Sequence, residues 1–561
     1  MAGLGTLKVE CIDCGTATPY HPLEVSCPQC GGLWREARYD LNSLRGAYPS
    51  GLRGRPFDLW RYLELLPLCS SPVIGMGEGG TPLFPARNMG LMLGLPYLFI
   101  KDERQGPTAS FKDRQAAITV AALTEAGIAE AVVASTGNVA IAFSAYCARA
   151  GIKLWAFLTS LVPAEKMHEV ALYGTQVVKV TGTYDQAKRL AAEFAHRRGL
   201  YFDRGTRSVA AVESMKTISF ELAEQLAGYP LPSPKDREGV TIWREPDWYF
   251  QSVSGGIGPF GVLKGFQELT ELGLIHAPPA LACIQAAGCS PMAAAWQQGK
   301  DVVDPVNHPS THIATLSTGD PGRAYTLLRS RMLATGRGAM DSVTDEEAFS
   351  AMHTVARMEG LSIEPAAAVA FAGLLKLARA GILQREDIIV VNCSGHTMPI
   401  EKHLLGDGWA RNVVLPSASL PESPQDGLLS ALAQLDLRRT HQILVVDDHA
   451  DARLLIKRIL QVQGEFVIRE ASSGSEALAT AREAPPDLVI LDLMMPEVDG
   501  FAVLDELKRQ PETASVPVIV VTAKELTTAE KRRLEGQIAK LMVKGSFLGE
   551  DLLREVGGAL D

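Results

Sequence analysis

The sequence predicts a multidomain α/β protein built mainly on parallel sheets, and three observations lead to this class. The chain has 561 residues, more than one compact core usually holds. From about residue 70 to 410, β-rich runs such as AEAVVAS and TQVVKVTG alternate with helical stretches such as YDQAKRLAAEFAHRRG. This alternation is typical of βαβ units around a parallel sheet. A second block with the same rhythm begins at QILVVDD and runs to the end.

Changes in composition divide the chain into four predicted segments. Residues 1–45 are turn-rich and contain paired cysteines, and residues 46–410 hold the longer alternating block. The stretch VLPSASLPESPQDG is rich in Pro and Ser, so we assign residues 411–440 to a linker. Residues 441–561 hold the second alternating block.

Composition and charge exclude several functional classes. The chain is 47% apolar and 21% charged, as expected of a globular protein. Its formal net charge is -10, which argues against nucleic-acid binding because that function needs a basic face. No apolar run reaches the roughly 18 residues of a membrane span, and the N-terminus has no signal-peptide core. We therefore expect a cytoplasmic protein with no nucleic-acid or membrane partner.

Four of the nine cysteines form two CxxC pairs near the N-terminus, namely Cys11 with Cys14 and Cys27 with Cys30. Twelve residues separate the pairs, and a glycine follows each pair and permits a tight turn. Four thiolates brought together in this way favour a tetrahedral zinc site with no open position. We therefore predict a structural zinc ribbon, with a pair of redox-active CxxC motifs or a site that has lost its metal as the alternatives. The other five cysteines are expected to pack as small apolar side chains.

Three polar or glycine-rich segments follow predicted strands in the long block. PTASFKDRQ (107–115) leads from a loop into an apolar helix. ASTGN (134–138) ends a strand and opens a helix, whose free N–H groups suit an anion. SVSGGIGPFGVLKGF (252–266) follows another strand. In a doubly wound sheet, ligands bind where loops leave the carboxyl ends of the strands, so these segments are expected to meet.

Two features of these segments together suggest a cofactor. A buried lysine amine such as that of Lys112 becomes a Schiff-base nucleophile once its pKa is lowered. Gly255, Gly256 and Gly258 let backbone N–H groups approach a phosphate closely. A lysine for an aldehyde and a glycine cradle for a phosphate describe pyridoxal phosphate, which accepts electrons from amino-acid carbanions. We therefore predict that Lys112 faces inward to hold this cofactor.

The motifs of the long block resemble those of threonine synthase and its relatives, which are fold-type II pyridoxal-phosphate enzymes. In chain order they are GEGGTPL, PTASFKDRQ, ASTGN, ESMKT, GGIGPFGVLKGF, IEPAAAVAFAGL and NCSGH. The resemblance covers roughly residues 70–405 and implies the tryptophan synthase β-like fold of two doubly wound subdomains. A zinc ribbon ahead of this core is also similar to some members, and we expect a homodimer.

The resemblance implies roles for individual residues. Lys112 resembles the Schiff-base lysine, which also acts as a general base at Cα. Asn138 resembles the residue that hydrogen-bonds the cofactor's phenolic oxygen, and Ser394 resembles the hydroxyl residue that faces the pyridine nitrogen. The expected substrate-carboxylate residues are Ser135, Thr136 and Gly137, and the expected phosphate loop comprises Gly255, Gly256, Ile257 and Gly258. A hydroxyl at Ser394 favours elimination and replacement at the β or γ carbon.

The sequence also departs from the family pattern, so the reaction stays open. The segment before the lysine motif is Gly106-Pro107-Thr108-Ala109, whereas the family usually has Asn-Pro-Thr-Gly. Conversion of O-phosphohomoserine to threonine is the first hypothesis. A cysteate synthase-like or other β-replacement or lyase reaction on O-phosphoserine-type substrates is the second, and a catalytically inactive signalling protein is the third. Arg323 is either a residue for a substrate anion or a structural arginine.

The second alternating block places acids and a base after its strands. ILVVDD ends in Asp447 and Asp448, LVILD ends in Asp492, VIVVT ends in Thr522, and Lys544 follows KLMV. Carboxylates gathered at one sheet edge repel one another unless a cation lies among them. Mg²⁺ prefers such oxygen ligands and keeps positions open for a phosphoryl group.

Together with DLMMPEVDG (492–500), this pattern resembles response-regulator receiver domains, which have a flavodoxin-type fold of five βα units. The resemblance implies that Asp492 accepts a phosphoryl group from a sensor histidine kinase or phosphotransfer protein. The implied Mg²⁺ ligands are Asp447, Asp448, Asp492 and the backbone carbonyl of Met494, and the implied phosphoryl contacts are Thr522 and Lys544. We expect phosphorylation to control an enzyme that acts on an amino acid. A docking domain that is not phosphorylated is the alternative.

Overall fold

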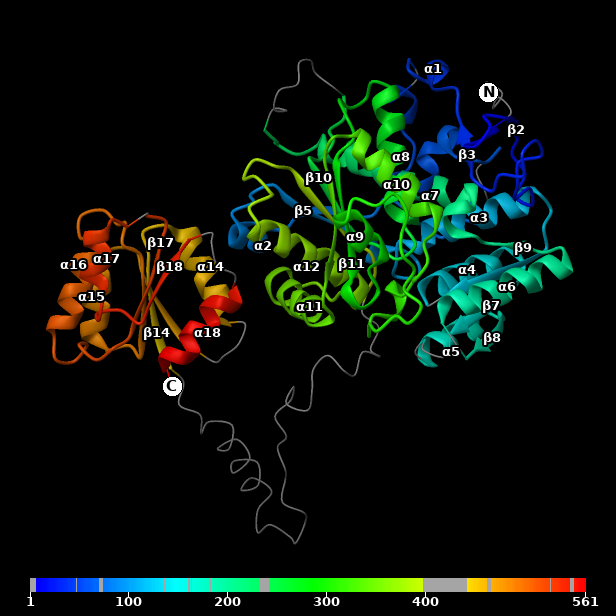
Figure 1. The fold of residues 1–561 in the computed structure, drawn as a ribbon. Helices are drawn as coiled ribbons and strands as arrows, with labels where there is room; N and C mark the ends of the chain where they lie inside the picture. Colours follow the sequence, from blue (N-terminus) through cyan, green and yellow to red (C-terminus); the bar gives the residue numbers. More distant parts are fainter. Residues whose placement is uncertain are drawn as a thin grey trace, which may run out of the picture. The chain divides into compact units, whose positions relative to one another are not determined.

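The computed structural model describes residues 7–46, 48–69, 74–135, 137–159, 162, 164–181, 183–232, 242–396, 441–461, 466–524, 526–544 and 549–560. These residues form two compact units, of which the larger contains most of the chain up to residue 400 and the smaller contains the C-terminal block. Figure 1 shows the helices and strands of both. The predicted linker, residues 411–440, lies outside the described residues, and so does Thr136. Among the described helices, none combines the length and apolar character needed to cross a membrane.

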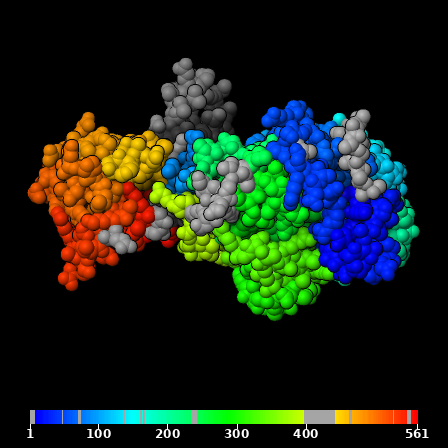
Figure 2. All heavy atoms as spheres, turned by 90° about the horizontal axis from the view of Figure 1, so that it is seen from above, coloured from blue at the N-terminus to red at the C-terminus, as the bar shows by residue number. Residues whose placement is uncertain are grey.

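A small antiparallel sheet opens the larger unit. It has the order β2-β1-β3 and consists of β1 (Lys8–Cys11), β2 (Ala17–Pro19) and β3 (Arg35–Arg38). The sheet buries Val9 and Ala37, and Lys264 Nζ donates a hydrogen bond of 2.8 Å to the Ala37 carbonyl. Figure 2 shows this blue segment packed against the rest of the larger unit. The ribbon therefore shares an interface with the core that follows it.

The larger unit contains two further sheets. The first has the order β12-β11-β10-β13-β5-β4 and is parallel except for β4. Its strands are β4 (Leu83–Pro85), β5 (Leu98–Asp102), β10 (Trp248–Ser252), β11 (Ala280–Ala286), β12 (Gly338–Val343) and β13 (Ile389–Cys393). The second is parallel, has the order β8-β7-β6-β9, and comprises β6 (Glu130–Ser135), β7 (Lys153–Thr159), β8 (Gln176–Val180) and β9 (Tyr201–Phe202). Every residue of β5, β10, β11 and β13 is buried, as expected of parallel strands covered on both faces.

Helices connect these strands and cover the sheets. The α-helices before residue 400 are α1 (Leu41–Leu44), α2 (Arg87–Leu93), α3 (Lys112–Glu125), α4 (Asn138–Ala150), α5 (Ala164–Leu172), α6 (Tyr184–Arg198), α7 (Val209–Leu226), α8 (Ile257–Glu271), α9 (Pro291–Gln297), α10 (Arg323–Ala334), α11 (Asp345–Glu359) and α12 (Pro365–Arg379). The 3₁₀ helices are η1 (Ser50–Leu52), η2 (Leu59–Leu65), η3 (Glu103–Gln105), η4 (Gly205–Arg207), η5 (Ala287–Cys289) and η6 (Ala314–Leu316). Local sequence explains several boundaries. For example, Thr183 and Gln186 form a capping box at the start of α6, and Gly199 ends that helix in the left-handed conformation.

The smaller unit has one parallel sheet with the order β15-β14-β16-β17-β18. Its strands are β14 (Gln442–Val446), β15 (Val467–Ala471), β16 (Leu488–Leu491), β17 (Val518–Thr522) and β18 (Lys540–Val543). Its helices are α14 (Ala450–Gln461), α15 (Gly474–Glu483), α16 (Gly500–Arg509), α17 (Thr528–Leu534) and α18 (Gly549–Leu560). The strand order 2-1-3-4-5 is that of the flavodoxin-type fold. The predicted fold of this block is therefore confirmed.

A buried ionic cluster fixes α3 within the larger unit. Arg114 is almost fully buried, and its guanidinium group donates hydrogen bonds of 2.5–2.9 Å to the carboxylates of Glu103 and Glu221. Lys101 Nζ lies 2.7 Å from a Glu221 oxygen, so two cations balance two anions. The cluster joins α3 to η3, β5 and α7. Because Arg114 lies two residues after Lys112, it also fixes the start of the helix that carries that lysine.

Removing the guanidinium group of Arg114 from this cluster should destabilise the larger unit. We expect Arg114→Met to lower the free energy of unfolding by about 3–5 kcal/mol, because it leaves a buried anion without its partner. Urea unfolding followed by tryptophan fluorescence measures this change, since the larger unit contains the six tryptophans Trp34, Trp60, Trp155, Trp243, Trp248 and Trp296.

Arg197→Met is the control for that measurement. Arg197 pairs with Glu193 on α6, but the two side chains are 76% and 53% exposed. Such a pair contributes about 0–1 kcal/mol. Equal effects of the two substitutions would contradict the role given to the buried cluster.

Candidate functional site

One cavity in the larger unit brings together the three segments predicted to meet. Its lining includes Lys112, Ser135, Asn138 and Ser394, together with Gly255, Gly256, Ile257 and Gly258. These residues lie at the start of α3, at the end of β6 and the start of α4, in the loop before α8 and its first turn, and after β13. Loops at the carboxyl ends of parallel strands thus converge, as the doubly wound fold predicts.

A short antiparallel bridge positions Lys112 beside Ser394. Ser110 pairs with Gly395, the Phe111 N–H donates to the Ser394 carbonyl at 3.0 Å, and the His396 N–H donates to the Ala109 carbonyl at 3.1 Å. Ala109 has a φ of 56°, a left-handed conformation that glycine adopts at lower cost. This explains physically why a glycine in place of Ala109 suits the turn before the lysine.

The environment of Lys112 favours a reactive amine. Burial lowers its pKa to about 8, and the negative charges of Asp203 and Glu364 only partly oppose this shift. The Nζ atom lies 4.2 Å from the centroid of the Phe111 ring. No described residue forms a hydrogen bond or ion pair with this Nζ, although many surround it. The amine is therefore free to react with an aldehyde in the cavity.

The loop before α8 forms a cradle for a phosphate. Gly256 has a φ of 89°, and a side chain on Gly258 would collide with that of Gln251. The 15-residue helix α8 begins at Ile257, so its unpaired N–H groups point toward the cavity. The buried Gln251 Nε2 has no hydrogen-bond partner in the described part of the chain and can donate to an acceptor. The cavity thus offers donors for the phosphate as well as an amine for the aldehyde of pyridoxal phosphate.

The loop between β6 and α4 is held by its own hydroxyl group. Ser135 Oγ accepts hydrogen bonds from the N–H groups of Gly137 at 2.9 Å and Ala140 at 3.1 Å. Gly137 has a φ of 143°, and a Cβ there would lie 3.2 Å from Lys166 Cδ. Ser135 therefore orders the loop, while its neighbour Thr136, also predicted to bind the substrate carboxylate, lies outside the described residues.

Asn138 is joined to a residue that the sequence analysis did not assign to the site. Its Nδ2 donates to the two Glu364 carboxylate oxygens at 2.9 and 3.0 Å, and its Oδ1 accepts from Lys166 Nζ at 3.2 Å. Glu364 lines the cavity and precedes α12, within the motif IEPAAAVAFAGL. The sequence contains this motif, and the acidic residue at its second position was the signal that could have identified Glu364.

Two cations on the cavity wall were also missed by the sequence analysis. Lys188 of α6 and Arg204 before η4 line the same cavity as Lys112. Burial, and next the positive charge of Arg207, lowers the pKa of both. Arg204 Nη1 is buried without a hydrogen-bond partner among the described residues, and the nearby charge of Asp203 only partly opposes these shifts. The local sequences YDQAKR and DRGTRS contain the charges, but only the fold brings them together.

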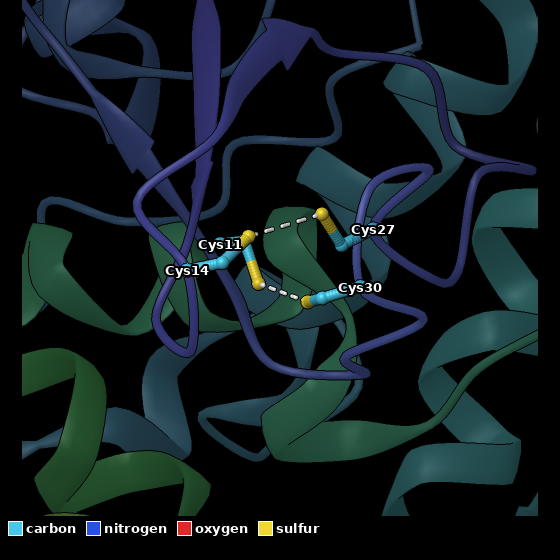
Figure 3. A group of neighbouring side chains, drawn as sticks. All are labelled: Cys11, Cys14, Cys27 and Cys30. Carbon is cyan, nitrogen blue, oxygen red and sulfur yellow. Dashed lines mark hydrogen bonds between the residues drawn. The ribbon is translucent and has the colours of Figure 1, made fainter.

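The four N-terminal cysteines converge on one point (Figure 3). The Sγ atoms of Cys11 and Cys30 lie 3.6 Å apart, as do those of Cys14 and Cys27, and all four lie within 4.8 Å of one another. Tetrahedral zinc with Zn–S bonds of about 2.3 Å needs sulfurs about 3.8 Å apart. The donor set and spacing fit zinc.

Arg323 does not line the cavity, and the structure favours its structural alternative. Its Nη1 lies 2.5 Å from Oδ1 of Asp13, which directly precedes Cys14. The guanidinium group is therefore engaged by the cysteine-rich segment rather than directed at a substrate.

The smaller unit gathers its predicted residues at the carboxyl edge of its sheet. Lys544 Nζ lies 2.5 Å from Asp447 Oδ2 and 2.6 Å from Asp492 Oδ2. Burial lowers the pKa of Lys544, but the hydrogen bonds that its ammonium group donates to both acids outweigh burial and raise the pKa overall. The Met494 N–H donates to Asp492 Oδ1 at 3.1 Å, and Thr522, at the end of the next strand, is fully buried.

Asp447 and Asp448 form a further cluster with His449, a residue that the sequence analysis did not assign. Their ligand atoms lie within 4.8 Å of one another, and His449 Nδ1 is 2.8 Å from Asp448 Oδ1. Carboxylate oxygens of this kind suit Mg²⁺. In the sequence, only the position of His449 directly after the two acids could have indicated that it belongs to this cluster.

Comparison with known proteins agrees with both units. Residues 74–395 match the pyridoxal-phosphate dependent enzyme family, and residues 443–554 match the response regulator receiver domain. Threonine synthase from Methanocaldococcus jannaschii is 33% identical over 391 residues, which cover 69% of this chain and 91% of that protein. The enzyme from Methanosarcina acetivorans is 30% identical over 397 residues, covering 70% and 91%. Threonine synthase from Mycobacterium bovis is 29% identical over 320 residues, covering 57% and 81%.

These matches and the two folds confirm the predicted architecture. The chain belongs to the pyridoxal-phosphate-dependent enzyme family and is a threonine synthase-like lyase with a C-terminal response regulator receiver domain.

Proposed function

We propose that the larger unit is an enzyme whose substrate is a phosphorylated amino acid. The reaction that we favour is the conversion of O-phosphohomoserine to threonine. One observation carries this proposal: Lys188 and Arg204 place positive charge on the wall of the cavity that contains Lys112, and Arg204 Nη1 has no hydrogen-bond partner among the described residues. Both residues are half-buried, and a charged group withdrawn from water is costly unless it gains a partner. A phosphate group on the substrate carries about -1.5 to -2 charge at neutral pH and would supply the missing partner.

The remaining cavity residues support chemistry at the amino-acid Cα. When bound, pyridoxal phosphate supplies an electron sink for a carbanion at this carbon. Lys112 would hold the cofactor and then serve as the base at Cα, since its lowered pKa makes the neutral amine accessible near neutral pH. Ser394 would face the pyridine nitrogen, Asn138 would bind the phenolic oxygen, and Ser135, Thr136 and Gly137 would bind the substrate carboxylate.

We further propose that phosphorylation of Asp492 controls this reaction. The ion pairs of Lys544 with Asp447 and Asp492 support the proposal, because they hold a lysine where phosphoryl oxygens would need a cation. The neighbouring acids Asp447 and Asp448 would bind Mg²⁺ with Asp492. The donor would be a sensor histidine kinase or a phosphotransfer protein.

Cofactor uptake should report the pKa of Lys112. Only the neutral amine attacks the aldehyde, so the rate at which cofactor-free protein takes up pyridoxal phosphate should rise about tenfold per pH unit at low pH. It should level off above about 8, where burial places this pKa. Absorbance near ~410–430 nm measures the uptake, with Lys112→Ala as the blank. A rate that continues to rise toward pH 10 would indicate an unperturbed lysine.

Neutralising the cavity cations should impair the use of phosphorylated substrates. We expect Arg204→Gln and Lys188→Met each to lower kcat/KM for O-phosphohomoserine by about 10- to 100-fold, the loss of one hydrogen bond to a charged group. Release of inorganic phosphate measures turnover, and the cofactor absorbance should stay unchanged.

Arg189→Gln is the matched control, because Arg189 lies on the same helix as Lys188 but is exposed. Unchanged kcat/KM in both cavity variants would contradict the proposed phosphate contacts. The same assay with O-phosphoserine separates the two substrate classes. If neither compound is consumed, with the receiver phosphorylated or not, the core is a signalling module and the enzymatic proposal fails.

Phosphorylation of the receiver can be tested directly. Incubation with acetyl phosphate and Mg²⁺ should add one phosphoryl group to the protein but none to Asp492→Asn, and chelation of Mg²⁺ should abolish the reaction. Intact-mass measurement gives the result. The exposed Asp451→Asn on α14 makes the same change of acid to amide and should leave phosphorylation intact. Modification of Asp492→Asn at the wild-type level would place the acceptor elsewhere.

A further inference from the structure

We propose that the zinc ribbon braces the cofactor cavity. In this proposal Asp13 holds Arg323, and Arg323 holds the loop of residues 314–322, which forms part of the cavity wall. Zinc binding and cofactor binding would then favour each other. The inference requires the cofactor cavity but not the substrate proposed above.

The first part of the brace is the position of Asp13 among the zinc ligands. Asp13 lies between Cys11 and Cys14, and its Oδ1 is 2.5 Å from Arg323 Nη1. Its other oxygen packs against Gly32, where a Cβ would lie 2.5 Å from Asp13 Oδ2 and 3.1–3.2 Å from the sulfurs of Cys11 and Cys30. The carboxylate is thus confined by both cysteine-containing turns, and its place depends on their closure.

Electrostatics explain why the metal would strengthen the contact with Arg323. The Asp13 and Arg323 side chains are 31% and 40% exposed, and an exposed pair alone contributes little. Zinc bound by four thiolates carries a net charge of about -2, because the ligands bind as thiolates. Together with Asp13, the loaded ribbon presents a strongly negative group to the guanidinium of Arg323. Loss of the metal would remove this attraction and the closure that positions Asp13.

The second part of the brace is the loop that ends at Arg323. Arg323 is the first residue of α10, and Thr318 and Pro321, which precede it, line the cavity. The hydroxyl groups of Thr318 and Ser254 lie 2.6 Å apart, and the Thr318 N–H also donates to Ser254 Oγ at 3.3 Å. Since Ser254 directly precedes the glycine cradle, the loop and the cradle share a hydrogen-bonded contact.

The same loop contacts the helix that carries Lys188. The Gly319 N–H donates to Asp185 Oδ2 at 3.2 Å, and Asp185 lies in the first turn of α6. A side chain on Gly319 would collide with the Val306 carbonyl, so the backbone is tightly seated. A contiguous series of contacts therefore runs from the cysteines through Arg323 to the cofactor cradle and α6. Such a series can transmit a shift at one end to the other.

Reciprocal binding measurements test this brace. If zinc tightens cofactor binding, the cofactor must tighten zinc binding by the same factor. In the full-length protein, we expect pyridoxal phosphate to raise the zinc affinity, measured by competition with a chromophoric chelator, by about fivefold or more. Removal of zinc should weaken pyridoxal phosphate binding by that factor. Neither readout involves substrate turnover, so failure here is distinct from failure of the proposed function.

Variants locate the coupling. Asp13→Asn and Arg323→Gln keep all four cysteines and should bind both groups, but with a coupling factor close to one, whereas Arg323→Lys should retain part of it. Arg329→Gln is the control, since it lies on α10 but pairs with Asp301. Equal zinc affinity with and without the cofactor in the wild-type protein would overturn the proposal, as would full coupling in Arg323→Gln. If Asp13→Asn no longer binds zinc, its coupling factor cannot be measured, and the coupling factor of Arg323→Gln then tests the proposal.

Discussion

The charge balance around Arg114 is the constraint on which the active-site geometry depends. Its planar guanidinium fork meets the carboxylates of Glu103 and Glu221 through directional hydrogen bonds in a site that is almost fully buried. Apolar packing alone would tolerate small sliding of α3, whereas these directional bonds would not. The bridge between Ser110 and Gly395 then fixes the turn before the helix. Lys112 lies between these two restraints, and its amine is held at the cavity.

Local charge, rather than net charge, explains what each site can bind. The chain as a whole is acidic, with a formal net charge of -10. The core cavity is nevertheless lined by three cations, Lys112, Lys188 and Arg204, against the two acids Asp203 and Glu364, and this excess of positive charge favours an anionic substrate. The receiver edge is acidic and is partly neutralised by Lys544, which favours Mg²⁺ and an incoming phosphoryl group. The ribbon becomes strongly negative only when its cysteines bind zinc as thiolates.

Much of the fold and site follows from local sequence signals. Strand-end positions predicted that Lys112, the ASTGN turn and the glycine cradle would meet, because the carboxyl ends of parallel strands share one edge, and Ser394 was assigned by resemblance. The same reasoning placed Asp447, Asp492 and Lys544 together in the receiver. The tight turns of the cysteine pairs could also be predicted, because a glycine follows each pair. Periodicity and motif spacing predict these features because each depends on a short stretch of sequence or on the position at which a strand ends.

The features that sequence did not predict depend on contacts between distant segments. Arg114 looks like an ordinary charged residue of a first helical turn, and only the approach of Glu221, 107 residues away, shows why it is buried. Arg323 forms an ion pair with Asp13, which lies near the N-terminus, and so its guanidinium group is not directed into the cavity. Lys188 and Arg204 belong to separate elements whose convergence is set by the second sheet. In each case the partner, rather than the residue type, determines the role.

The absorbance spectrum of the purified protein beside Lys112→Ala tests the central claim most directly. We predict a band near ~410–430 nm in the wild-type protein that is absent from the variant, and a shift of this band on addition of O-phosphohomoserine. A shift with O-phosphoserine alone would keep the cofactor site but change the substrate class. The absence of the band in both proteins, with pyridoxal phosphate supplied in excess, would contradict the account.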